Sequence, residues 1–154
     1  MNFVSPVEDQ LFALNICAGI AEIAQADRFS SASEDVVSAI VSGIGDFAAG
    51  EWAPLNRLGD QQGSVLRDGK VQAPDGFAAA YQAYVENGWN AIAGAEEFGG
   101  QGLPFSLACC VLESLGSANM AFTLLPMLTV GAIEALQHHG SAAQQALYLP
   151  RLIS

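Results

Sequence analysis

The chain has 154 residues, of which 51% are hydrophobic, 14% charged and 8% aromatic. This length fits one domain with a real core, and the prominence of alanine, glycine and leucine favours packed helices over a β-sandwich. A net charge of −11 repels phosphate backbones and anionic lipid, so we expect neither nucleic-acid binding nor membrane binding.

The first 25 residues predict one amphipathic helix. Ser5, Pro6 and Glu8 have the arrangement of a capping box with proline at the first helical position. Apolar residues then recur at helical spacing, so we expect this helix to end near Gln25. Acidic residues precede the first apolar run, where a secretion signal carries basic ones, and we therefore expect a cytoplasmic protein.

The three cysteines are Cys17, Cys109 and Cys110. The last two are adjacent, which does not suit a bridge between them, and all three fall within apolar helical patterns. We interpret them as small core residues in a reducing compartment, and their spacing indicates no metal site.

A second helix is predicted from a capping box formed by Ser31 and Glu34, and its apolar stripe continues towards Trp52. Glycines and prolines then break the periodicity throughout residues 54–76, which we predict to be mostly loop. Residues 65–71 within this segment have the pattern of a short turn between extended arms.

The remaining helices are predicted from their start and stop residues at 75–86, 104–115, 119–138 and 141–149. Asn87 and Gly88 end the first of them, and a glycine-containing loop at 89–104 follows. Ser141 and Gln144 form a capping box for the last, and Pro150 is expected at or just past its end. The fold class is therefore all-α, a bundle of about six helices.

Residues 114–133 carry no charge and are long enough to span a bilayer. Polar residues and Pro126 interrupt the stretch, and no basic flank follows it. We therefore predict a helix that other helices bury on nearly all sides, with Pro126 in its first turns or at a kink.

The most conspicuous candidate for chemistry is the glycine-rich segment Gly99–Pro104. It lacks the lysine and hydroxyl residue of a phosphate-binding loop, so we favour a tight turn in which glycine permits close backbone contact. Neither the adjacent pair Glu96 and Glu97 nor the pair His138 and His139 has the spacing of a catalytic or metal site. No catalytic residue is predicted within this chain.

One stretch, from Glu86 to Pro104, resembles a signature of acyl-CoA dehydrogenases, in which a Gly-Trp pair leads into Pro-Glu-Glu-Tyr-Gly-Gly-Gln-Gly-Leu-Pro or a near variant, and Phe98 stands where tyrosine or phenylalanine occurs. Ala95 stands where that family usually has proline. The first 30 residues resemble the N-terminal extension of a longer subfamily that includes 3-methylmercaptopropionyl-CoA dehydrogenases. The resemblance implies one helical domain over residues 1–154, with an extension helix at 1–30 and the N-terminal acyl-CoA dehydrogenase domain at 31–154.

The resemblance also implies a function in fatty acid metabolism. Members of the family oxidise an acyl-CoA thioester to the 2-enoyl-CoA, with a carboxylate removing the α-proton and FAD taking the hydride. An electron-transfer flavoprotein reoxidises the flavin, and the enzymes form homo-oligomers. The catalytic glutamate and most FAD contacts belong to a middle β-domain and a C-terminal helical domain that these 154 residues do not contain. The isolated chain is therefore expected to be inactive.

By the same resemblance, four residues would face the acyl chain and form one wall of its pocket: Phe122, Thr123, Pro126 and Val130. Small apolar and hydroxyl side chains suit such a wall because their volumes set the pocket depth. The alternative for each is ordinary core packing at helical spacing. A second hypothesis for the chain as a whole is a stand-alone helical module that pairs with a separate chain through an apolar face.

Overall fold

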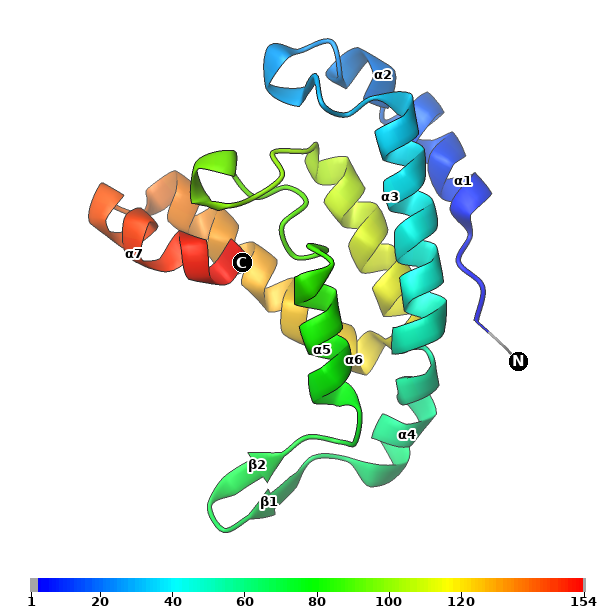
Figure 1. Ribbon diagram of the computed structural model, residues 1–154, viewed down its shortest axis with the longest axis vertical. Helices are drawn as coiled ribbons and strands as arrows, with labels where there is room; N and C mark the ends of the chain where they lie inside the picture. Colours follow the sequence, from blue (N-terminus) through cyan, green and yellow to red (C-terminus); the bar gives the residue numbers. More distant parts are fainter. Residues whose placement is uncertain (1–2, 154) are drawn as a thin grey trace.

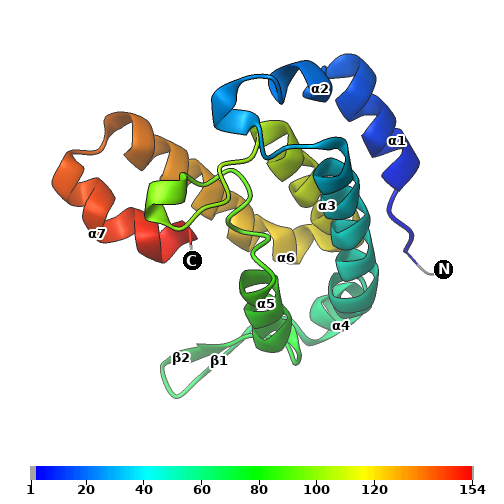
Figure 2. The same cartoon turned by 45° about the horizontal axis from the view of Figure 1, so that its top comes forward.

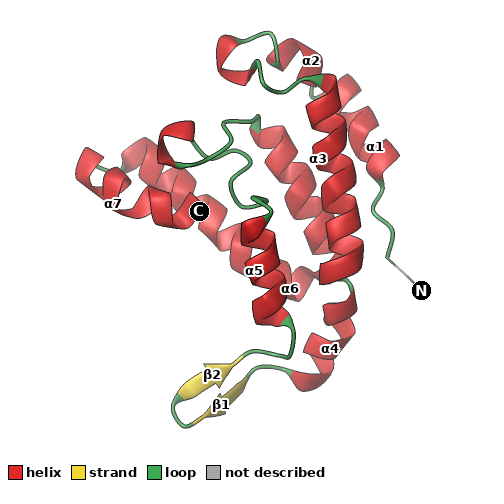
Figure 3. Ribbon diagram, in the orientation of Figure 1, coloured by secondary structure: helices red, strands yellow, loops and turns green. Residues whose placement is uncertain are grey.

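The computed structural model describes residues 3–153. Their regular secondary structure is helical apart from one two-stranded hairpin, which confirms the predicted all-α class (Figures 1 and 3). The elements in chain order are α1 (Val7–Phe12), the π-helical turn η1 (Ala13–Cys17), α2 (Ile20–Ile23), the 3₁₀ turn η2 (Asp27–Phe29), α3 (Glu34–Phe47), the π-helical turn η3 (Ala48–Trp52), α4 (Pro54–Gln62), β1 (Val65–Arg67), β2 (Lys70–Gln72), α5 (Phe77–Glu86), the 3₁₀ turn η4 (Glu96–Phe98), α6 (Phe105–His139) and α7 (Ala142–Ile153).

The N-terminal segment is not the single helix that the periodicity predicted. Gly19 has a φ of 61°, a left-handed conformation that ends the first helical stretch and separates α1 and η1 from α2. The predicted capping box is also wrong, because no side chain caps α1. The Ser5 hydroxyl instead lies 3.1 Å from the hydroxyl of Ser114 on α6.

A buried polar cluster fastens this N-terminal segment to α6. Gln10 is only 3% exposed. Its Nε2 donates to the Glu113 carboxylate at 3.0 Å and to the Ser114 hydroxyl at 3.2 Å. On α3, Gly45 leaves room for Val7, since a Cβ at that glycine would lie 3.1 Å from a Val7 methyl group. The extension is thus packed onto the two central helices by both polar and apolar contacts.

Replacing the Gln10 amide should loosen the extension. We expect Gln10→Ala to lower the free energy of unfolding by about 1–3 kcal/mol, because Ser114 loses a buried partner. Gln25→Ala, at an exposed position, serves as the control and should change it by less than about 0.5 kcal/mol. Urea denaturation followed by circular dichroism measures both, and equal effects would contradict a role for the cluster.

The second helical region begins later and extends further than predicted. Ser33, not Ser31, is the cap of α3, and its hydroxyl accepts from the Val36 N–H at 3.4 Å. The π turn η3 then shifts the hydrogen-bond register, and Pro54 takes the first position of α4, where its missing N–H costs nothing. The loop prediction is therefore wrong for residues 54–62.

The turn with extended arms at residues 65–71 is confirmed as the β1–β2 hairpin. Its strands pair antiparallel, with Leu66 opposite Val71 and Arg67 opposite Lys70. Asp68 at the tip has a positive φ of 50°, and the following glycine has a φ of 74°. Two positive φ angles give the right twist for a two-residue hairpin turn.

The C-terminal helices are longer than predicted. The predicted helices 104–115 and 119–138 run together as α6, which changes direction at Asn119 (φ −158°, ψ 86°) and not at Pro126. The capping box before α7 is confirmed, with the Gln144 side chain accepting from the Ser141 N–H at 2.8 Å. Pro150 lies inside α7, which continues to Ile153.

Packing around α6 forms two groups of buried side chains. The larger one joins α3, η3, α5 and the first half of α6, with Trp52 and Leu115 fully buried at its centre. The smaller one joins the end of α6 to α7 through Ile133, Leu149 and Ile153. Because α6 crosses behind α5 and extends on to α7, it links the two groups (Figures 1 and 2).

The second half of α6 presents an apolar face to solvent, so the prediction of burial on nearly all sides is wrong. This apolar face consists of Met120, Leu124, Leu125, Met127 and Leu128. Leu128 is 75% exposed. Within residues 3–153, α6 is also the one helix long and apolar enough to cross a membrane, a property it shares with core helices of soluble proteins. That the chain binds no membrane stays a prediction.

Candidate functional site

The candidate site is built on the bend of α6. Asn119 behaves as an internal helix cap, since its Oδ1 accepts from the Phe122 N–H at 3.2 Å and its Nδ2 donates to the Trp52 carbonyl at 3.4 Å. The Thr123 hydroxyl donates to the Asn119 carbonyl at 2.9 Å and accepts from Trp52 Nε1 at 3.0 Å. These bonds satisfy the backbone groups that the bend frees, and they hold the second half of α6 in a defined direction.

Phe122 and Thr123 both point into the core. The Phe122 ring stacks on Trp52 with centroids 4.0 Å apart and on Phe77 at 4.2 Å. Thr123 is fully buried against η3. Core packing therefore accounts for both side chains within this chain, and their contact with an acyl chain stays a prediction.

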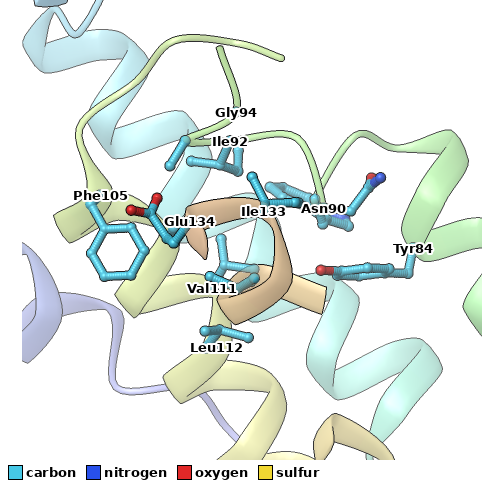
Figure 4. Close-up of a pocket in the computed structure, with 13 residues that line it drawn as sticks. Tyr84, Asn90, Ile92, Gly94, Phe105, Val111, Leu112, Ile133 and Glu134 are labelled. Carbon is cyan, nitrogen blue, oxygen red and sulfur yellow. The ribbon is translucent and has the colours of Figure 1, made fainter. Parts of the chain in front are cut away.

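Pro126 and Val130 lie further along the same helix and line small cavities. Both border a cavity of about 100 Å³ between α5, α6 and α7, together with Tyr81, Tyr84 and Arg151. Val130 also borders a second cavity of about 30 Å³, drawn in Figure 4. The structure thus separates the four predicted residues into a buried pair and a cavity-lining pair.

The cavity in Figure 4 lies between α5, the loop that follows it and α6. Tyr84 and Asn90 lie on one side of it, and Phe105 and Glu134 on the other. The Nε1 of Trp89, which also lines this cavity, is buried without a hydrogen-bond partner in residues 3–153, and so is the Asn90 Oδ1. A volume of about 30 Å³ accommodates about one ordered water and excludes an acyl chain.

Trp89 and Asn90 also belong to the site. The sequence motifs did not single out either residue, although both lie within the motif between Glu86 and Pro104. The Asn90 Nδ2 donates to the Ile153 carbonyl at 2.6 Å, which ties the loop to the end of α7. A polar residue directly after the Gly-Trp pair was the available signal. Its partner could not be identified because it lies 63 positions later.

The glycine-rich loop is confirmed as a tight turn with close backbone contact. The Gly102 N–H donates to the Gly94 carbonyl at 2.9 Å, and the Leu103 N–H to the Ile92 carbonyl at 3.0 Å. Gly100 packs directly against the backbone of Gly94, leaving no room for a Cβ. These contacts place Leu103 in the core and set the starting direction of α6.

Burial raises the pKa of Tyr84 and of Cys110. Desolvation, and to a smaller extent Tyr81, raises the pKa of Tyr84 well above its ordinary range, so its phenol stays protonated at neutral pH. Desolvation, followed by Glu113 and Cys109, raises the pKa of Cys110 to about 11. The core interpretation is confirmed for Cys110 and wrong for Cys109 and Cys17, which are exposed.

The acids and histidines considered from the sequence lie at the surface. Glu96 and Glu97 are exposed, and His138 Nε2 lies 3.3 Å from the Glu134 carboxylate one helical turn away. In residues 3–153, no three His, Cys, Asp or Glu side chains gather in a metal-binding arrangement. The site is therefore an apolar surface with the phenol of Tyr84 and the amide of Asn90 at its edge.

Comparison with known proteins agrees with the motif. The sequence model of the acyl-CoA dehydrogenase N-terminal domain matches residues 37–154. The chain is 36% identical over all 154 residues to a protein named 3-methylmercaptopropionyl-CoA dehydrogenase from Ruegeria pomeroyi. It covers 26% of the length of that relative, so it spans about a quarter of it.

Proposed function

This chain belongs to the acyl-CoA dehydrogenase family through its N-terminal domain, and on that premise we propose that it forms one wall of the acyl pocket of a FAD-dependent acyl-CoA dehydrogenase. The reaction is the oxidation of an acyl-CoA thioester to the 2-enoyl-CoA. The observation that carries the proposal is the apolar face of α6, which is exposed beside Thr123, Pro126 and Val130.

The two sides of α6 support this role in different ways. On the inner side, Asn119, Thr123 and Trp52 hold the helix with a closed set of hydrogen bonds. On the outer side, Leu124 and Leu128 are spaced four residues apart, share one side of the helix, and are 52% and 75% exposed. A pocket wall needs both properties, since a rigid backing keeps the apolar lining at a fixed depth.

The substrate class follows from the relative. Its name specifies 3-methylmercaptopropionyl-CoA, a short acyl group bearing a thioether, and we take this thioester as the first candidate substrate. Apolar contact suits both the methylene groups and the polarisable sulfur of such a chain.

The two cavities beside Val130 are too small to hold a flavin. The two cavities beside Val130 measure about 30 and about 100 Å³, below the roughly 300 Å³ at which pockets for small organic ligands begin. We therefore assign no flavin contact to these two cavities, and the residues of this chain that contact the cofactor stay unknown. In the proposed enzyme, FAD and the catalytic glutamate belong to a middle β-domain and a C-terminal helical domain, the electron acceptor is an electron-transfer flavoprotein, and the assembly is a cytoplasmic homo-oligomer.

Activity of the 154-residue chain provides the test. Mixed with FAD, 3-methylmercaptopropionyl-CoA and a dye acceptor, the purified chain should bleach no dye above the rate without protein, because it lacks the proposed base. The full-length Ruegeria pomeroyi relative serves as the positive control. Dye bleaching by the chain alone would contradict the proposal that FAD and the catalytic glutamate belong to the other two domains.

A second candidate function is a stand-alone helical module that pairs with a separate chain. The same apolar face favours it, because a surface of this kind is usually covered by a partner. Size-exclusion chromatography with and without a separately expressed chain carrying the remaining domains distinguishes the two. Joint elution and restored dye reduction support the module, whereas separate elution supports a domain that works only within one polypeptide.

A further inference from the structure

A polar cavity lies where α5, α6 and α7 meet, and it is the larger of the two cavities that Val130 borders, with a volume of about 100 Å³. Its lining on α6 comes from one side of the helix, because the residues recur at helical spacing: Pro126, Thr129, Val130 and Ile133. By the same spacing, Leu124 and Leu128 of the exposed apolar face point to the opposite side of α6. The cavity is therefore a feature separate from that face.

The polar groups around this cavity are mainly hydrogen-bond donors. Tyr84, only 2% exposed, contributes a phenol, and Tyr81 contributes a second one from the same helix. Thr129 adds a hydroxyl, and the exposed Arg151 of α7 adds a guanidinium, which can only donate. Because burial, and to a smaller extent Tyr81, raises the pKa of Tyr84 well above its ordinary range, this phenol keeps its proton.

The charge around the cavity is opposite in sign to that of the chain. The chain has five basic residues against 16 acids, yet the described residues that line this cavity include Arg151 and no acid. The one ion pair within residues 3–153 joins His138 to Glu134, so Arg151 has no acidic partner among them. A guanidinium forms its strongest hydrogen bonds with oxyanions. A positive group beside several hydroxyl donors therefore favours a ligand with negatively charged oxygens.

One buried acceptor narrows the class of anion. The Asn90 Nδ2 donates to the Ile153 carbonyl at 2.6 Å, which directs the Asn90 Oδ1 away from that carbonyl. This Oδ1 is buried and has no hydrogen-bond partner within residues 3–153. A buried acceptor without a donor is destabilising, so the ligand should also carry a hydroxyl. Hydrogen phosphate carries one at neutral pH, whereas sulfate does not.

The volume of the cavity suits an inorganic ion. About 100 Å³ is several times the roughly 30 Å³ of one water in the liquid, and it lies below the roughly 300 Å³ at which pockets for organic ligands begin. We propose that this cavity binds hydrogen phosphate as a free ion. Arg151 provides the charge, and the Tyr84 phenol donates to a phosphate oxygen. The Asn90 Oδ1 accepts from the phosphate hydroxyl.

Titration of the 154-residue chain with inorganic phosphate tests the proposal. Phosphate replaces chloride at constant ionic strength and neutral pH, so that general screening does not change. The probe is the side-chain amide of Asn90 in ¹H–¹⁵N NMR spectra. Its signals should shift and saturate with a Kd of about 1–10 mM. The Kd for sulfate should be at least about fivefold higher, because sulfate leaves the Asn90 Oδ1 without a donor.

Two variants each remove one proposed contact. Arg151→Gln should raise the Kd for phosphate at least about tenfold, because a charge-assisted hydrogen bond is lost. Tyr84→Phe keeps the buried ring and should raise the Kd at least about threefold, because one neutral donor is lost. The matched controls Arg57→Gln and Tyr148→Phe remove the same groups at exposed positions and should leave the Kd within about twofold. Circular dichroism checks that each variant is folded, and the exposed Arg151 provides a test even if Tyr84→Phe is unstable.

Three results would overturn the proposal. The first is the absence of a saturable shift below about 50 mM phosphate. The second is sulfate binding as tight as phosphate binding, which would mean that the Asn90 Oδ1 faces only the smaller cavity that it also borders. The third is an equal loss of binding in the site variants and their controls. The titration needs neither FAD nor acyl-CoA, so the phosphate site and the proposed function can each fail alone.

Discussion

Replacing Gly100 with alanine is expected to unfold the chain or nearly so. A Cβ at Gly100 would overlap the carbonyl group and Cα of Gly94, and these are backbone atoms that cannot rotate away as a side chain can. Gly94 is itself held by its hydrogen bond to Gly102 and by contact with Ile153. We expect a loss of at least about 4 kcal/mol, with a fall in Tm of about 10 °C or more.

The measurement is thermal unfolding by circular dichroism, with Gly131→Ala as the matched control. Gly131 lies in α6, and a Cβ at this position would have no neighbouring atom within 4 Å. Alanine there should therefore raise the free energy of unfolding by up to about 1 kcal/mol. The pair separates steric overlap from the general effect of replacing glycine. A loss below about 1 kcal/mol for Gly100→Ala would show that the loop can open without disturbing the core.

The second large effect is expected for Trp52→Ala. Trp52 is fully buried, stacks on Phe122 at 4.0 Å and contacts Tyr84 at a ring distance of 5.7 Å. Truncation removes the largest buried side chain of the main core and leaves the hydroxyl of Thr123 without its indole donor. We expect a loss of about 3–5 kcal/mol in urea denaturation.

A double-mutant cycle isolates the hydrogen bond from the packing. Trp52→Phe keeps an aromatic ring against Phe122 but removes the Nε1 donor, and Thr123→Val removes the acceptor at nearly constant volume. The two changes together should be less harmful than the sum of the single changes, with a coupling energy of about 0.5–1.5 kcal/mol. Additive losses would mean that Trp52 acts on α6 through ring packing alone.

The two predictions concern different supports of the same helix. Gly100 sets the direction in which α6 begins, and the Trp52 side chain holds Thr123, four residues after the bend at Asn119. If the apolar face of α6 forms the pocket wall, milder changes at either support should alter activity of the whole enzyme before they unfold it. That connection belongs to the proposed function.

Local signals predicted those elements whose boundaries depend on neighbouring residues. The box formed by Ser141 and Gln144 starts α7 as predicted, and Asn87 with Gly88 ends α5. The glycines of the 99–104 segment predicted close backbone contact, which Gly100 makes. In each case the two groups that interact, either a hydrogen-bond donor and acceptor or two backbone segments in contact, lie within a few residues of each other along the chain.

Errors occurred where a distant partner decided the local conformation. Ser5 has the spacing of a cap, but its hydroxyl lies beside Ser114, 109 positions away. The helix continues through Pro54 because a π turn resets the register before it, and Pro126 does not mark the bend because Asn119 finds its partner on Trp52. No pattern of nearby residues contains these contacts.

By itself, the sequence determined the helical class, the glycine-rich turn and the family, because each depends on residue types at short, fixed spacing. Only the tertiary structure decided which side of α6 is buried. Phe122 and Leu124 are both apolar and two positions apart, yet Trp52 and Phe77 cover the first, whereas the second is 52% exposed. Burial depends on what packs against a side chain, and that is a property of the assembled helices.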